Sequence, residues 1–146
     1  MAITSAICNS FKQEILEAEH NFTASTGTTF NLALYTSSAT LGASTTAYTS
    51  SNEITNSSGT AYSAKGKALT SVTPTLDSST AVCDFADVSW TSASFTANGC
   101  LIFNDSHSTD AAVCAIAFGG DKTVSSGTFT IQFPAAAATT AIIRIA

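Results

Sequence analysis

The chain has 146 residues, and a chain of this length is expected to fold as one domain that buries about 70% of the surface exposed when it is unfolded. Only 10% of the residues are charged, and Ser, Thr and Ala dominate long stretches. Ten acidic and five basic residues give a net charge of −5 and an isoelectric point near 4.6. This balance argues against binding to nucleic acid or to anionic membrane surfaces.

The N-terminal segment 5–18 shows the one helical pattern in the chain. Its apolar residues recur at intervals of three and four, with polar residues on the opposite face. The apolar positions are Ile7, Phe11, Ile15 and Ala18. We expect a short helix whose narrow apolar stripe lies across a face or edge of a sheet.

Beyond residue 28 the apolar residues alternate with polar ones, which predicts half-buried strands. Seven to nine short strands are expected within segments 28–35, 67–72, 81–85, 88–90, 94–96, 100–103, 113–118, 127–133 and 141–145. Between them, segments rich in Gly, Asn, Asp and Ser predict reversals at 98–99, 104–106, 119–122 and 125–127. The predicted fold class is all-β: residues 1–146 form a single antiparallel β-sandwich or jelly-roll-like domain with one short N-terminal helix.

Residues 36–66 do not fit this rhythm. Large side chains are sparse there, and the four that occur are Leu41, Tyr48, Ile54 and Tyr62. Because a structureless loop of this length is unusual in a compact domain, we expect an extended, Ser/Thr-rich excursion that contains a short helical or strand piece. The four large residues would anchor it, and its surface would be available for contacts between subunits.

No apolar run reaches the roughly 20 residues that span a bilayer, and no secretion signal is recognisable at the N-terminus. We therefore expect a soluble chain made in the cytosol. The four cysteines are scattered, form no Cys-x-x-Cys pair and lie in strand-like segments: Cys8, Cys83, Cys100 and Cys114. They are interpreted as buried thiols, and disulfide pairing in an oxidising compartment is the alternative.

The residues that could support chemistry are few. Asp105, His107 and Asp110 could hold a metal ion, but their segment is typical of a polar hairpin loop whose side chains form turns. The densest ionisable cluster is interpreted as the solvated face and exit of the helix: Glu14, Glu17, Glu19 and His20. No nucleophile elbow, phosphate-binding loop or dinucleotide fingerprint is present. We expect no catalytic, cofactor-binding or metal-binding residue, and no enzymatic activity.

Two further patterns have a structural explanation. Asn21, Asn56 and Asn104 match the N-glycosylation motif, which arises by chance in a chain so rich in Ser and Thr. Trp90 and the nine phenylalanines could form a platform for sugar stacking, but most of them alternate along strands, which indicates a core.

Several segments resemble, in the same order along the chain, a family of small virion proteins of tailed bacteriophages. They are Ile-Cys-Asn-Ser-Phe-Lys-Gln-Glu-Ile-Leu (7–16), 30–41, Ala-Tyr-Thr-Ser-Ser-Asn-Glu-Ile (47–54), 59–62, 67–70, Phe-Ala-Asp-Val-Ser-Trp (85–90), 117–134 and Ala-Ile-Ile-Arg-Ile (141–145). Within that family, the chain most resembles a capsid decoration, or cement, protein. The resemblance covers nearly the whole chain and contains no catalytic motif.

The resemblance implies a protein made in the bacterial host cytoplasm and located on the capsid surface of the virion. It would bridge adjacent major capsid protein subunits of a phage head and form homodimers or homotrimers, with no cofactor. Two alternatives stay open: a tail- or head-fibre-associated virion protein, and a carbohydrate-binding or lytic module.

Overall fold

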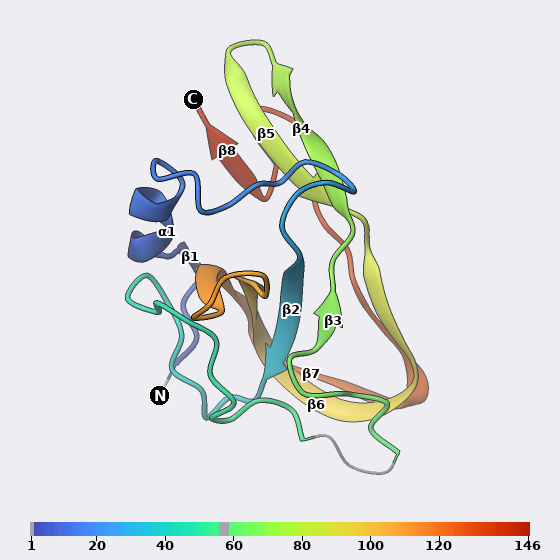
Figure 1. The fold of residues 1–146 in the computed structure, drawn as a ribbon. Coiled ribbons are helices and arrows are strands. Elements are labelled where there is room, and N and C mark those ends of the chain that lie inside the picture. Colours follow the sequence, from blue (N-terminus) through green and yellow to red (C-terminus); the bar gives the residue numbers. More distant parts are fainter. Residues whose placement is uncertain (1, 56–58) are drawn as a thin grey trace.

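The structure is a computed structural model that describes residues 2–55 and 59–146. It consists mostly of antiparallel β-structure in a sandwich-like arrangement of two sheets, with one short N-terminal helix, which confirms the predicted fold class (Figure 1). The larger sheet contains, in spatial order, β1 (Ala6–Ile7), β7 (Ala111–Ile131), β6 (Val88–Asn104), β2 (Phe30–Tyr35) and β3 (Lys67–Ala68). The smaller sheet contains β4 (Ser71–Asp77), β5 (Thr80–Phe85) and β8 (Ile143–Ile145), in that order.

The dominant element is the hairpin of β6 and β7, whose strands are 17 and 21 residues long. The sequence predicted five short strands in these regions, and that prediction was wrong. Near Asn98, a single β6 residue faces four residues of β7, because Ala97 pairs with Lys122 while Gly99 pairs with Ala117. The extra residues form a bulge that bends the ribbon without ending it.

The turn residues predicted at 98–99, 119–122 and 125–127 therefore lie inside strands. Gly119, Gly120 and Ser126 do adopt positive φ angles of 74°, 144° and 47°. Their conformational preference was recognised correctly, but it produces bulges instead of reversals. Of the predicted reversals, the one at 104–106 is confirmed, since the chain turns between β6 and β7 there.

The helix α1 (Asn9–Glu14) is shorter than the predicted segment 5–18. At its start, Ala6 and Ile7 pair with β7 as an edge strand, so the backbone there is extended. At its end, a turn follows and Ala18 adopts a φ of 62°, which a continuing helix does not allow. Only Phe11 of the helix is buried.

The region 67–72 was predicted as one strand and is instead divided between β3 and β4. The strand β4 continues to Asp77, and almost all of its residues are exposed. It is an edge strand with Pro74 at an irregularity in its pairing with β5, which is where a sheet tolerates proline. Pro74 and the absence of buried residues are the reasons why alternation did not reveal β4.

The excursion 36–66 contains no named helix or strand in its described residues, 36–55 and 59–66, so the predicted short piece of regular structure is wrong. Its backbone is held instead by single bridges, such as Glu53 to Tyr35 and Ala47 to Ala111. The predicted anchors are confirmed: Leu41, Ile54 and Tyr62 are buried, and Tyr48 packs against the core.

The core contains two groups of aromatic side chains. The first lies between the sheets next to the helix and comprises Phe11, Phe22, Phe30 and Phe85. The second lies against the bent part of the hairpin and comprises Tyr62, Trp90, Phe95 and Phe129. Trp90 is only 1% exposed, which confirms that it belongs to the core.

All four cysteines are buried, as predicted, and their thiols are free. Burial raises the pKa of Cys8 to about 11 and that of Cys83 and Cys100 to about 12. A thiol with a pKa this high is protonated near neutral pH and is a poor nucleophile. The cysteines therefore act as small apolar side chains in this fold.

Replacing Trp90 by Ala should lower the free energy of unfolding by about 3–5 kcal/mol, because a large buried ring is exchanged for a cavity between Tyr62 and the hairpin. Urea denaturation measures the change. Leu16→Ala is the control, since Leu16 is 88% exposed and its loss should change stability by less than about 0.5 kcal/mol. Equal effects of the two substitutions would contradict the assignment of Trp90 to a packed core.

Candidate functional site

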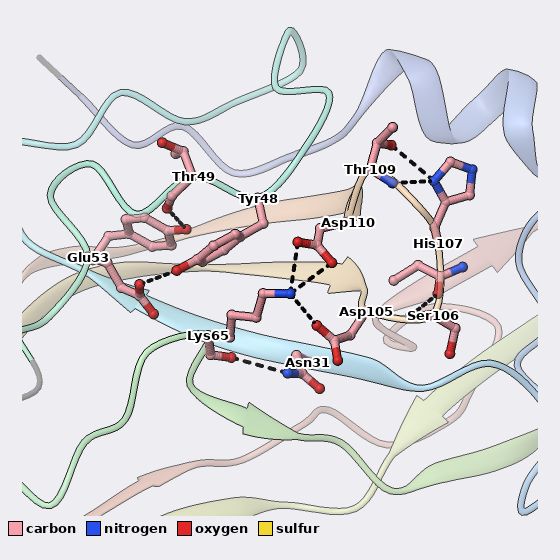
Figure 2. A network of polar contacts seen from close by, with 12 residues as sticks. Asn31, Tyr48, Thr49, Glu53, Lys65, Asp105, Ser106, His107, Thr109 and Asp110 are labelled. Atoms are coloured by element: carbon pink, nitrogen blue, oxygen red, sulfur yellow. Dashed lines mark hydrogen bonds and ion pairs between the residues drawn. The ribbon is translucent and has the colours of Figure 1, made fainter.

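The excursion and the β6–β7 turn meet in a network of polar side chains (Figure 2). At its centre, Lys65 Nζ lies 2.9 Å from Asp105 Oδ1 and 2.9 Å from Asp110 Oδ2. The same ammonium lies 5.7 Å from the centre of the Tyr48 ring. The two carboxylates raise the pKa of Lys65 above its usual value, so the lysine remains a cation throughout the neutral range.

The backbone at Lys65 and Gly66 adopts an unusual conformation where the excursion crosses β2. Lys65 and Gly66 adopt positive φ angles of 66° and 67°. A Cβ atom on Gly66 would lie 1.8 Å from the carbonyl oxygen of Leu32, so only glycine fits at this crossing of β2. The chain then continues directly into β3.

A second part of the network surrounds the carboxylate of Glu53. The phenol of Tyr48 donates a hydrogen bond to Oε2 over 2.5 Å, and the phenol of Tyr62 donates one to Oε1 over 2.7 Å. The Tyr62 oxygen also accepts a hydrogen bond from the amide of Leu34 in β2. Both oxygens of one carboxylate thus join two parts of the excursion to the larger sheet.

His20 lies on the other side of the β6–β7 turn and is buried, with 5% of its surface exposed. Asn104 Nδ2 donates a hydrogen bond to its Nδ1 over 3.1 Å, so the proton of the neutral ring lies on Nε2 and points to Glu14 Oε2 at 2.8 Å. The interpretation of Glu14 and His20 as a solvated helix face was wrong. The chain folds back after Ala18, which places the imidazole against Phe11.

Asn104 is the residue whose role the sequence did not reveal. It is fully buried; its amide also donates to the carbonyl of Glu19 over 3.0 Å, and its Oδ1 accepts the amide of Ser106 over 3.0 Å. The pattern Asn-Asp-Ser predicted this turn, but not the contact with the segment after the helix. Its burial also means that the glycosylation motif at Asn104 is inaccessible in the folded chain.

The three residues considered as metal ligands do not converge. Asp105 and Asp110 both bind Lys65, whereas His107 Nδ1 faces the hydroxyl of Thr109 over 3.0 Å. Within residues 2–55 and 59–146, no three His, Cys, Asp or Glu side chains form a group suited to a metal ion. In this arrangement the lysine ammonium, in place of a metal, neutralises the two carboxylates.

His107 is the more exposed of the two histidines, and its Nε2 lies 3.6 Å from Glu19 Oε2. Thr109, His107 and Glu19 are the residue types of a catalytic triad. However, Nδ1 also accepts the backbone amide of Thr109, as expected of a local turn, and none of the three residues lines either of the cavities described below. The geometry is that of a stabilised loop.

The described residues form an apolar groove and a polar cleft at the edges of the sandwich. An apolar groove of about 430 Å³ separates α1 and the segment after it from the inner face of the smaller sheet. A second cleft of about 330 Å³ is lined mainly by hydroxyl and backbone groups of segments 23–29 and 69–71.

Of the remaining glycosylation motifs, Asn21 accepts a hydrogen bond from the amide of Thr23 through its Oδ1, and Asn56 lies outside the described residues.

No family model, no curated protein and no solved structure matches the chain. In the part of the chain that the structure describes, no helix has the length and apolar character needed to cross a membrane.

The raised pKa values of the tyrosines and cysteines indicate that the protein loses stability in alkali. Burial, followed by the charge of Glu53, raises the pKa of Tyr35. Burial and the hydrogen bond to Glu53 raise the pKa of Tyr62 well above its usual value, and they raise the pKa of Tyr48 to about 12. In the unfolded chain these phenols ionise above about pH 10. Since the unfolded state then binds fewer protons than the folded state, the free energy of unfolding must fall as the pH rises through this range.

Tyr62→Phe isolates one such group. At pH 7 it should lower the free energy of unfolding by about 1–3 kcal/mol, because the Leu34 amide and Glu53 each lose a partner. It should also make stability fall less steeply above pH 10, because one proton-binding difference is removed. Urea titrations from pH 7 to pH 11 under reducing conditions test both effects; an unchanged alkaline slope would contradict the linkage.

Proposed function

We propose that the chain is a structural virion protein that binds the outer surface of a tailed-phage head and bridges major capsid protein subunits. The proposal starts from the resemblance of segments along nearly the whole sequence to small virion proteins of tailed bacteriophages. On this proposal the protein has no enzymatic activity, needs no cofactor and works by contact alone.

The observation that carries the proposal is the way the ionisable groups are used. Lys65 neutralises Asp105 and Asp110, Glu53 holds two phenols, and Glu14 holds His20. These contacts fasten loops to the sheets and pair these particular groups with one another. Because only 10% of the residues are charged, the surface is weakly charged, and such a surface suits contact with many identical neighbours.

The hydroxyl groups on the β6–β7 hairpin also support a role in contacts with neighbouring proteins. Across β6 and β7, Ser89 pairs with Thr130 at 2.7 Å and Thr96 pairs with Thr123 at 2.8 Å, all at exposed or partly exposed positions. Contacts through such hydroxyls are individually weak. If several such contacts can form at the same time, each contact raises the effective concentration for the next, and the total affinity for a symmetric shell exceeds that of any single contact.

The alternatives differ in copy number and chemistry. A tail- or fibre-associated protein would share this surface but occur in few copies per particle. A carbohydrate-binding module would need exposed aromatic rings, and burial of Trp90 at 1% exposure counts against that role.

Adding the purified protein to undecorated capsids should raise their threshold for thermal or chemical disruption. A ligand that binds only the assembled state stabilises it, by about 2.7 kcal/mol per site at a free concentration of 100 times Kd. Light scattering during heating measures the shift, with heat-denatured protein as the control. An unchanged threshold at saturating protein would refute the decoration role.

A further inference from the structure

The contacts described above leave the apolar groove between α1 and the smaller sheet without a role. One wall is formed by α1 and the residues after it, through Phe11, Ile15, Ala18 and Phe22. The other wall is the smaller sheet, through residues 81–83 and 143–145. At about 430 Å³ and with a mainly apolar lining, the groove has the size and character of a binding site.

The apolar wall continues beyond the groove onto the projecting end of the smaller sheet. Ala81 pairs with Leu76 on one side and with Ile145 on the other, so the three side chains lie in one row on the same face. Leu76 is 73% exposed and Ile145 is 61% exposed. Figure 1 shows the tip of the β4–β5 hairpin projecting past the helix and the larger sheet.

Leu16 adds an exposed apolar side chain to the turn that forms the opposite wall, with 88% of its surface accessible. Scattered exposed residues are normal, but Ile145 lines the groove, Leu76 pairs with the lining residue Ala81, and Leu16 follows the lining residue Ile15. An apolar patch that is continuous with a groove is typical of a site that binds a partner.

Acidic residues alternate with the groove-lining residues on the α1 side. Glu14, Glu17 and Glu19 precede or follow Ile15, Ala18 and His20 along the chain. Of the two basic residue types that line the groove, His20 bonds to Glu14, and the guanidinium of Arg144 donates a hydrogen bond to the carbonyl of Ala138. Glu14 is engaged by His20, whereas Glu17 and Glu19 are exposed on either side of the groove residue Ala18. These two exposed glutamates are called the acidic rim of the apolar groove.

We propose that this groove binds a segment of a partner protein whose apolar side chains are flanked by Lys or Arg. Apolar side chains would fill the groove and cover Leu76 and Ile145, and the basic groups would face Glu17 and Glu19. Complementary charge at the rim steers the segment and sets its orientation, while the buried apolar contacts supply most of the affinity.

Two other occupants fit less well. Addition of a strand to the smaller sheet is hindered at β4 by Pro74 and its irregular pairing, and β8 offers only three residues. A second copy of the chain could offer its exposed Leu16 or Leu76 to the groove. Acidic residues follow both leucines, Glu17 and Asp77, and they would approach the acidic rim. Repulsion of like charges disfavours that arrangement.

Synthetic amphipathic peptides test the chemistry without a known partner. A Leu/Lys peptide about five helical turns long and a Leu/Glu peptide of the same pattern are titrated into the isotopically labelled full chain. The Leu/Lys peptide should shift the amide resonances of residues 15–22, 74–83 and 143–145, and it should bind at least about tenfold more tightly than the Leu/Glu peptide. Equal binding of both peptides, or shifts confined to other regions, would overturn the proposal.

Matched variants test the surface. The double variant L76S/I145S should weaken binding of the Leu/Lys peptide about tenfold or more, because two apolar contacts are lost. V72S is the control: Val72 is an exposed apolar residue on the same strand, but it pairs with Asp84 and lies on the other face. The charge reversal E17K/E19K should invert the preference between the peptides. Equal effects of L76S/I145S and V72S, or an unchanged preference in E17K/E19K, would refute the assignment.

The identity of the partner rests on the proposed function, in which a capsid protein carries the segment. Binding of wild type, L76S/I145S and V72S to undecorated capsids separates the two ideas. If wild type does not bind, the decoration role fails, and the peptide titrations still decide the groove. If wild type and L76S/I145S bind equally, the groove is not the capsid contact. Sedimentation of the free chain identifies a second copy: dimers that L76S/I145S abolishes would overturn the proposed occupant.

Discussion

The β6–β7 hairpin is the constraint on which the rest of the structure depends. The half next to the turn at 105–110, here the proximal half, forms the centre of the larger sheet, where β6 pairs with β2 and β7 pairs with β1. Its distal half bends at the bulge opposite Asn98 and forms a second aromatic group around Trp90. Because the same two strands run through both regions, we expect the two aromatic groups to form and unfold as one cooperative unit. The excursion closes the bend by placing Tyr62 on Trp90.

The polar contacts follow from this architecture. A chain that leaves β2 and returns to β3 without regular secondary structure must satisfy its backbone and side chains individually. Glu53 does so through two phenols and Lys65 through two carboxylates, and both sites contact the hairpin or its neighbour β2. The ionisable groups that elsewhere form active sites serve here to attach loops. This use of charge is consistent with a protein proposed to act through its surface, with the apolar groove as its candidate contact.

The sequence predicted the fold class, the burial of the cysteines and the anchors of the excursion, because apolar alternation reports directly on burial. It did not predict the continuity of β6 and β7, since Gly119 and Gly120 favour positive φ equally in a reversal and in a bulge. The strand β4 is exposed, so its sequence shows no alternation of buried and exposed positions. The length of the helix was overestimated because Ile7 fits a helical apolar stripe as well as an edge strand. The contact of His20 with Asn104 joins residues 84 positions apart, and no local pattern reports on such a pair.

The most direct test of the account is native-state hydrogen exchange of the hairpin amides. If β6 and β7 unite both aromatic groups in a single domain of residues 1–146, the amides that pair the two strands near Leu101 and those near Trp90 should exchange with the same free energy of opening, equal to that of global unfolding. A distal half that opens at a markedly lower free energy, while the amides near Leu101 stay protected, would show two independent units and contradict the account.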